Sequence, residues 1–341
     1  MRRPSRQQGV VLLIVLFFAL LLTSSIATFT RRSITDAIVA RNRDAASRAE
    51  ALARSGIRLG KAVLMLDEEL KEILGPEIDS QQDDWYQLSS MVIPASDDAT
   101  LRVQMEDAGS RFNLNSIFNY ADEEVTWDET EPFLQAFIEK VIDEMKLPPE
   151  EKELYDPLEL AGALIDWVDA DSVGLNGGNE DDYYQMQEPP YRAANGPLLS
   201  VDDLFLIEGF DHKLVESLRP YVSVEPFAGG GGINLNTAPS HVLSLLYFND
   251  GIDDRLANSG EVKKIIEIRE EGGLLCDESG GNENCTPISS ITPNAIFPPP
   301  IFSSGIFKIV ANAAVGDIDR SIEAVINRSA DPPLVLSWIV R

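Results

Sequence analysis

The first thirty residues combine a short basic leader with a long uncharged segment. Three arginines precede Gly9, residues 7–30 carry no charge, and residues 10–22 are wholly apolar. About twenty helical residues, at about 1.5 Å each, cross the hydrocarbon core of a bilayer. The pattern predicts a transmembrane helix over residues 10–30, with its basic start in the cytoplasm and the rest of the chain on the far side of the membrane.

A helical pattern continues beyond this segment. No proline occurs between Pro4 and Pro76. Apolar or small residues recur at steps of three and four, the spacing of one helix face. They are Ala49, Leu52, Gly56, Leu59, Val63, Leu66, Leu70 and Ile73. We therefore expect one continuous rod, in which residues 31–75 form an amphipathic stem with this apolar face.

Two distant parts of the chain have the period of β-strands. Residues 99–117 alternate between apolar and polar side chains, and residues 306–315 and 321–328 read as a hairpin around Gly316-Asp317. The stretch "PLVLSWIV" supplies a last strand. The face of the first strand that we expect to be buried carries Leu101, Val103 and Met105. A long helix with these strands predicts an α+β fold, with about 190 residues inserted between the first and last strands.

The inserted segment reads as helical. Asp156 before Pro157 is a candidate helix start, Ser200 and Asp203 have the spacing of a capping box, and Asp211 is a further candidate cap. Two short helices are expected about a turn at Gly209. One face of another helix carries Phe133, Phe137, Val141 and Met145. The residues expected to anchor the core include Trp85, Trp127, Trp167 and Trp338.

The charge is unevenly distributed. The formal net charge is −28, yet residues 31–61 carry eight basic and three acidic side chains, and residues 62–341 carry 17 basic and 53 acidic ones. A body of charge −36 repels phosphate backbones, so we expect no nucleic acid as a partner. Solubility and calcium-rich surroundings both remain explanations of this acidity.

Two cysteines, Cys276 and Cys285, flank a polar, glycine-containing stretch. Such a loop closes readily as a disulfide in an oxidising compartment. A zinc site would need further Cys or His ligands, and the chain has two histidines, His212 and His241. We therefore predict a Cys276–Cys285 disulfide.

The acidic stretch "DWVDADSVGLNGGNEDDYY" is the best candidate metal site. Asp169, Asp171, Gly174 and Glu180 fall at positions 1, 3, 6 and 12 of an EF-hand loop. Val173 breaks that pattern at position 5, and a helix after Glu180 is doubtful. Asp169, Asp171 and Glu180 are candidate calcium ligands, and a solvated acidic loop is the alternative. The disulfide loop, with Asp277, Glu278 and Glu283, is a second candidate.

Catalytic signatures are missing from the sequence. There is no HExxH, G-x-S-x-G or P-loop motif. We expect both histidines at the surface or near helix starts rather than as catalytic bases, and cysteine catalysis lacks an identifiable partner. We therefore expect a protein that is not an enzyme.

The N-terminus admits two interpretations. An ordinary signal peptide would be cut after Ala27, where "SIA" offers small residues. Two features argue against it: the apolar run begins directly after Gly9, without a polar spacer, and the helical pattern continues beyond Thr30. A basic leader that ends in glycine before a long helix resembles a prepilin signal. That resemblance implies cleavage by a prepilin peptidase between Gly9 and Val10, with methylation of the new N-terminus.

The fifth residue after this cleavage point is Ile14, and this residue narrows the resemblance from pilins in general to one family. Most pilins carry glutamate there, and its carboxylate is thought to neutralise the N-terminal amine of a neighbouring subunit, because an isolated charge in lipid is costly. The type II secretion minor pseudopilin called general secretion pathway protein K lacks it. The chain resembles that family also in "LIDWVDAD", "NEDDYY", "DLFLIEGFDHKLVESLRPYVSV" and "GINLNTAPSHVL".

The resemblance implies a type IV pilin-like fold with a large helical, helix-hairpin-helix-like insertion. It implies domains at residues 1–9 (leader), 10–30 (transmembrane helix), 31–75 (periplasmic helix), 76–118 (first part of the body), 119–226 (inserted helical domain) and 227–341 (remainder of the body). It also implies calcium binding, inner-membrane anchoring and a tip complex with minor pseudopilins I and J that caps the pseudopilus.

Two other functions remain open. A minor pilin of a type IV pilus would share the processing and the rod. The phrase "INLNTA" also occurs in membrane-anchored helix-hairpin-helix receptors for DNA. In this chain, however, Glu208 and Asp211 flank the turn at Gly209, where phosphate binding needs cations.

Overall fold

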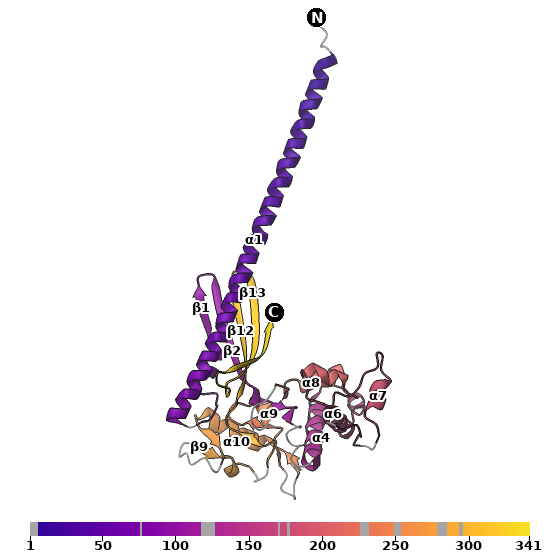
Figure 1. Cartoon of the computed structure of the whole chain (residues 1–341), viewed down its shortest axis with the longest axis vertical. Coiled ribbons are helices and arrows are strands. Elements are labelled where there is room, and N and C mark those ends of the chain that lie inside the picture. Colours follow the sequence, from indigo (N-terminus) through magenta and orange to yellow (C-terminus); the bar gives the residue numbers. More distant parts are fainter. Residues whose placement is uncertain are drawn as a thin grey trace.

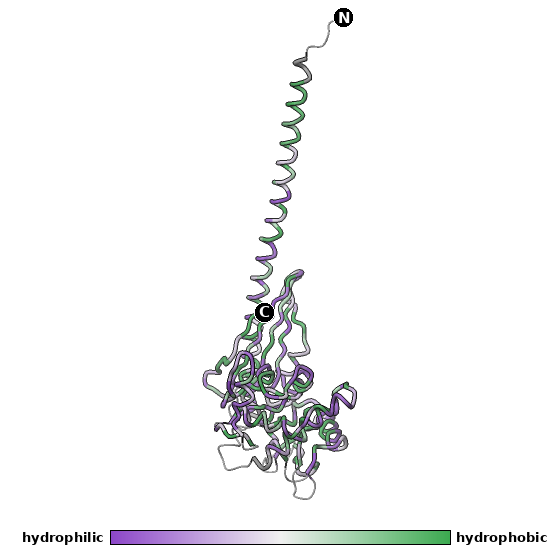
Figure 2. The backbone as a smooth tube through the Cα atoms, turned by 90° about the vertical axis from the view of Figure 1, so that its right-hand side faces the viewer, coloured by the Kyte–Doolittle hydropathy of each residue, from purple (hydrophilic) through white to green (hydrophobic). Residues whose placement is uncertain are grey.

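The computed structural model describes residues 6–75, 77–116, 127–169, 171–175, 178–225, 232–248, 254–277, 285–292 and 296–341, and, within them, the side chains of all but residues 6–9, 74 and 127–129. One helix, α1 (Arg6–Leu74), runs through the predicted transmembrane and stem segments without a break. Its N-terminal half projects from the body as a bare rod (Figure 1). The outer end of this rod is the most continuously hydrophobic part of the backbone (Figure 2).

The C-terminal half of α1 lies on a five-stranded antiparallel sheet (Figure 1). The strands follow the order β1 (Val92–Ser96), β2 (Ala99–Asp107), β12 (Ile306–Val315), β13 (Ile318–Asn327) and β14 (Leu334–Val340). The sequence therefore leaves the sheet at Asp107 and returns about 200 residues later, where Phe307 pairs with Asp107. This confirms the α+β, pilin-like fold with a large insertion between the first and last strands.

The strand predictions hold apart from the ends of the strands, and the alternation expected over residues 99–117 forms one strand only as far as Asp107. Strand β2 alternates between buried and exposed residues, and Leu101, Val103 and Met105 face the core as expected. Strand β12 has the predicted bounds. Strand β13 begins at Ile318 rather than at residue 321, because Gly316 and Asp317 alone make the turn and Val315 already pairs with Ile318.

The face of α1 that contacts the sheet agrees only in part with the predicted apolar face. Ala49 and Gly56 are buried as predicted, and Leu52 and Val63 are half-buried against the core. Leu59, Leu66, Leu70 and Ile73 were predicted wrongly, because they are 38–72% exposed, and the buried face continues instead through Ala53, Ile57 and Leu64. The contact is close, because a Cβ atom on Gly56 would lie 2.8 Å from the Cβ of Ala311. Small residues on one side of the helix therefore decide which side meets the sheet, even where larger apolar residues lie on another.

The other helices in the described part of the chain are shorter than α1. They are α2 (Asp84–Ser89), α4 (Trp127–Glu144), α5 (Pro149–Lys152), α6 (Pro157–Val168), α7 (Asp181–Gln185), α8 (His212–Leu218), α9 (Ser240–Leu243) and α10 (Ser259–Glu270), with 3-10 turns η1 (Ala108–Ser110), η2 (Val201–Leu206) and η4 (Ile288–Ser290). The short strands are β3 (Phe112–Asn113), β4 (Val222–Ser223), β5 (Ile233–Asn234), β6 (Tyr247–Phe248), β7 (Arg255–Leu256), β8 (Leu274–Cys276), β9 (Cys285–Pro287), β10 (Ile296–Phe297) and β11 (Pro300–Ile301).

The predicted helix signals lie where the helices begin. The Asp156 side chain accepts hydrogen bonds from the first turn of α6, and Ser200 and Asp203 form a reciprocal capping box on η2. Asp211 caps α8 through the Leu214 N–H, and Gly209 between η2 and α8 has a φ of +80°. The predicted face of α4 is buried at Phe133, Phe137 and Val141, with Met145 just beyond its end.

The tryptophans that were expected to anchor the core differ in their burial. Trp85 and Trp167 are buried in two different cores. Trp338 was predicted wrongly: it lies on the edge strand β14, 39% exposed, under the guanidinium of Arg54. The side chain of Trp127 lies outside the part of the chain that is described.

The insertion contains the same small motif twice. In "FNLNS" (112–116) the Asn115 side chain donates to the carbonyl of Leu198 and accepts from its N–H. In "INLNT" (233–237) Asn236 does the same with Leu275. Each motif begins with a short strand that pairs in parallel, β3 with β4 and β5 with β11. The insertion is therefore built from two similar units joined in series.

Both units share one hydrophobic core, and the sheet with α1 has another. The described residues between 233 and 301 belong to the second unit, and the large sheet resumes only at Ile306. The inserted segment is thus longer than the predicted 119–226, and the sheet-forming part of residues 227–341 is confined to the last strands. The physical reason is that the short strands of the second unit pair with one another and leave the large sheet to β12–β14.

Candidate functional site

The exposed rod of α1 begins with the predicted transmembrane segment. Every residue from Val10 to Thr30 is exposed, and one helix, starting at Val10, is long and apolar enough to cross a membrane. The hydroxyls of Thr28 and Thr30 donate to carbonyls one turn earlier, at 2.8 and 2.9 Å, so these polar groups are satisfied inside the helix. Gly9 and Val10 lie within α1, and Ile14 lies in this uncharged stretch. The segment is compatible with a single membrane anchor.

An exposed apolar seam follows lower on α1. Leu59, Leu66, Leu70 and Ile73 are exposed, and Val63 is half-buried. Their spacing alternates between four and three residues, which is the heptad pattern of a helix that packs along another helix. About 100° of rotation per residue puts this seam roughly a quarter turn from the face that contacts the sheet. We call these five residues the α1 seam.

A second site lies in the acidic loop between α6 and α7. Carboxylate oxygens of Asp166, Asp169 and Glu180 lie within 4.8 Å of one another. Asp166 also accepts a hydrogen bond of 3.0 Å from the Leu175 N–H, which folds the loop back onto α6. Asp169 Oδ1 and both carboxylate oxygens of Glu180 are buried without a hydrogen-bond partner. Buried oxygens of this kind are the ligands that a hard cation such as calcium prefers.

The raised pKa values of the acids in this loop also favour a bound cation. Burial, and then the neighbouring carboxylates, raise the pKa of Asp169 to about 6 and the pKa of Glu180 to about 7. Burial also raises the pKa of Asp166. Ionising three carboxylates that are buried close together costs free energy when no cation is bound. Burial removes their hydration, and like charges at short range repel one another. The donor set fits a calcium ion.

The sequence identified two of these three acids. Asp169 and Glu180 lie together, but the Asp171 side chain is exposed and accepts from the Val173 N–H at 2.7 Å. Asp166, which the EF-hand spacing passed over, takes its place because it lies one turn before Asp169 at the end of α6. A helix does follow Glu180, namely α7, although the sequence did not predict one there.

The predicted disulfide is present between Cys276 and Cys285 and joins β8 to β9. Within the proposed second calcium loop, Asp277 is described and Glu278 and Glu283 lie outside the described residues. The hairpin of η2 and α8 has its cations engaged by acids: Lys213 pairs with Glu151, and Arg219 with Asp202 and Glu216.

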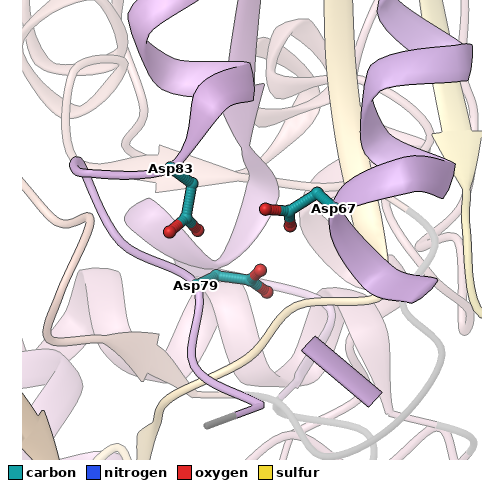
Figure 3. A group of neighbouring side chains, drawn as sticks. All are labelled: Asp67, Asp79 and Asp83. Atoms are coloured by element: carbon teal, nitrogen blue, oxygen red, sulfur yellow. The ribbon is translucent and has the colours of Figure 1, made fainter. Parts of the chain in front are cut away.

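A third acidic cluster was not expected from the sequence. Asp67, near the end of α1, faces Asp79 and Asp83 from the segment that follows it (Figure 3). The ammonium of Lys71 lies among them, 2.7 Å from Asp67, 2.8 Å from Asp79 and 2.5 Å from Asp83. The guanidinium of Arg328, at the end of β13, lies 2.5 Å from Asp79. Protein cations already hold these carboxylates, so this cluster is an ion-pair network and not a metal site.

Comparison with known proteins agrees with this architecture. Residues 110–227 match the family model for type II secretion system protein K. Protein K of Aeromonas hydrophila is 28% identical over 97% of this chain and 96% of its own length. Protein K of Pectobacterium carotovorum is 29% identical over 79% and 77%. A chain of the crystal structure of the GspK–GspI–GspJ complex from enterotoxigenic Escherichia coli has a TM-score of 0.59, with 18% identity, over 89% of this chain and 99% of that one.

The rod, the antiparallel sheet and the uncharged N-terminal segment define a pilin-like protein whose sheet carries a large helical insertion. Within that class, residues 110–227 match the family model for type II secretion system protein K, and the chain is similar to protein K of Aeromonas hydrophila over nearly its whole length.

Replacing Lys71 by methionine should lower the free energy of unfolding by about 3 kcal/mol or more, because breaking a buried ion pair leaves uncompensated carboxylates. Thermal and urea unfolding of the solubilised chain measure this. Lys146→Met, at an exposed site, is the matched control. A loss no larger than that of the control would show that the three aspartates do not depend on the ammonium.

Proposed function

We propose that this protein is a structural, non-enzymatic subunit at the tip of the type II secretion pseudopilus. It would start or cap the fibre that helps to export folded proteins. The observation that carries the proposal is Ile14 within an uncharged membrane segment. A subunit that repeats along a fibre uses a carboxylate at this position to meet the amine of the subunit ahead, whereas the first subunit has no such amine to neutralise.

The shape of the body supports the same position. The two-unit insertion lies at the end of the sheet farthest from the bare rod and extends to one side of it (Figure 1). A body of this width would collide with its copies if it were repeated along a thin fibre. At the tip it has no neighbour beyond it.

Processing is the first requirement of this function. We infer that a prepilin peptidase cuts between Gly9 and Val10, and that the mature chain is held in the inner membrane by residues 10–30 with its body in the periplasm. Intact-mass measurement of the membrane-purified chain, with and without a prepilin peptidase, tests this. Loss of residues 1–9 supports it. Loss of residues 1–27, as from an ordinary signal peptide, or no cleavage, contradicts it.

The α1 seam supplies a surface for partner subunits. The GspK relative was crystallised with GspI and GspJ, and we propose that minor pseudopilins I and J bind this chain as well. Their N-terminal helices would cover Leu59, Leu66, Leu70 and Ile73, which the sheet leaves exposed. Burying one such side chain contributes about 1.5–3 kcal/mol, so a few of them are enough for a stable helix contact.

The double substitution Leu59→Gln and Leu66→Gln should weaken co-purification with I and J by at least about tenfold, because apolar burial at the interface is lost. Its melting temperature when isolated should change little, since both side chains are exposed. Leu154→Gln with Leu199→Gln, at positions 81% and 88% exposed on the insertion, is the control. Undiminished binding, or equal loss in the control, would contradict the role of the seam.

We also propose that the acidic loop binds calcium through Asp166, Asp169 and Glu180. The ion would neutralise the three carboxylates and fasten the end of α6 to the start of α7, which stiffens the first unit of the insertion. The buried oxygens of Asp169 and Glu180 without partners support this assignment.

Calcium should raise the melting temperature strongly at pH 8 and weakly at pH 5.5. Glu180 and Asp169, with pKa values of about 7 and about 6, must lose their protons to bind it. Without calcium, the free energy of unfolding should fall as pH rises from 5.5 to 8. In that range the folded state still holds protons on Asp169 and Glu180 that the unfolded state has released.

Glu180→Gln should abolish the calcium effect and stabilise the metal-free protein, since it removes one of the repelling charges. Asp182→Asn, at an exposed neighbouring acid, should leave both behaviours intact. Equal calcium stabilisation of the Glu180→Gln variant would refute the assignment.

A further inference from the structure

Between the transmembrane segment and the body, α1 runs alone. Residues 31–44 are all exposed, and the first half-buried residue of the stem is Ala45. Fourteen helical residues span about 21 Å, so the body stands clear of the membrane surface by about that distance if the helix is upright. Figure 1 shows this stretch of α1 without any neighbouring element.

Four arginines lie on this free stretch. They are Arg31, Arg32, Arg41 and Arg43, accompanied by Asp36 and Asp44. Within the described part of the chain, none of the four guanidinium groups makes an ion pair or a hydrogen bond, whereas Arg48, one turn further on, is engaged by Asp98 at 3.1 Å. The four arginines nearest to the proposed membrane segment therefore have no partner within the described part of the protein.

Two of them stand at the membrane boundary. Residues 10–30 span about 31 Å at about 1.5 Å each, close to the thickness of the hydrocarbon core. Arg31 and Arg32 follow directly, so insertion of residues 10–30 would bring them to the level of the phosphates of the lipid headgroups. Arg41 and Arg43 stand about 15 Å further out, beyond contact and about two Debye lengths from that layer at physiological salt.

The directions of the side chains favour a partner that surrounds the helix. At about 100° per residue, Arg31 and Arg32 diverge by roughly a right angle, and Arg41 leaves on the side opposite to Arg32. One docked helix covers a single face and would meet only some of them. A layer of headgroups meets Arg31 and Arg32 together, whatever their direction.

A contact between these arginines and anionic lipids would counteract the electrostatic repulsion between the acidic body and the membrane. Residues 62–341 carry a net charge of −36, which an anionic membrane surface repels. Cations at the base of the rod attract the same surface locally, and a cation at an anionic membrane contributes about 1 kcal/mol.

We propose that Arg31 and Arg32 bind the phosphate groups of anionic phospholipids in the leaflet from which α1 emerges, and that Arg41 and Arg43 strengthen this attraction weakly and at longer range. This inference rests on the membrane insertion proposed above. The contact fixes the depth of the helix in the membrane before assembly and holds the acidic body near a surface that would otherwise repel it.

The full-length chain, reconstituted in vesicles of phosphatidylethanolamine with a minor fraction of phosphatidylglycerol, tests the inference. The lipids that stay bound after solubilisation are quantified by mass spectrometry. The wild-type chain should be enriched in phosphatidylglycerol over the vesicle. Arg31→Gln with Arg32→Gln should reduce this enrichment, by up to about fivefold per arginine at low salt, the factor that corresponds to about 1 kcal/mol. Arg41→Gln with Arg43→Gln should reduce it less.

The control is Arg58→Gln with Arg102→Gln, which removes two exposed arginines from the body with the same change in net charge. Unchanged enrichment in the Arg31/Arg32 variant, or equal loss in the control, would overturn the inference. So would a variant that keeps its lipid preference and instead loses minor pseudopilins I and J, because the arginines would then serve acidic partner chains.

Extraction with alkaline carbonate separates this inference from the one on which it rests. A wild-type chain that is released from the membrane fraction contradicts membrane anchoring, and the lipid contact falls with it. A wild-type chain that stays in the membrane but shows no preference for phosphatidylglycerol contradicts the lipid contact alone.

Discussion

The ammonium of Lys71, held by three aspartates, is the interaction on which the arrangement of the body depends. It joins the last turns of α1 to the segment that leaves the helix, and Arg328 adds the end of β13 through Asp79. The same region holds the insertion, because the Asn234 side chain donates to the Asp79 carbonyl and to the buried Asp107 carboxylate. Rod, sheet and insertion therefore meet at one network of buried charges, whose members are costly to separate because each would be left unpaired out of water.

The composition of the long helix changes along its length. Residues 10–30 are uncharged, which is compatible with a membrane anchor, and the exposed residues 31–44 carry four arginines. Further on, Gly56 and its small neighbours let one side approach β12 closely, while larger apolar residues form the α1 seam on another side. The stem therefore has two apolar faces, of which one holds the sheet and the other is exposed.

Two clusters of three acids illustrate how surroundings decide the role of a carboxylate. Around Lys71, protein cations neutralise Asp67, Asp79 and Asp83, and the cluster is a fixed part of the fold. Around Glu180 no protein cation is within reach among the described residues, burial raises the pKa, and oxygens are left without partners. The same kind of carboxylate therefore stabilises the structure in one place and forms a candidate cation site in the other.

The sequence by itself determined the elements that depend on local pattern: the uncharged helix, the alternation of β2, the hairpin around Gly316, the helix caps and the disulfide. It also named Asp169 and Glu180, since they flank one short loop. Only the tertiary structure decided which face of α1 meets the sheet. The helix comes close to β12 where Gly56 lies against Ala311, and a contact between two distant small residues cannot be read from the pattern of either segment. The tertiary structure alone brought Asp166 into the acidic loop and Arg328 to Asp79, some 250 residues away, because contacts between distant segments leave no periodic trace in the sequence.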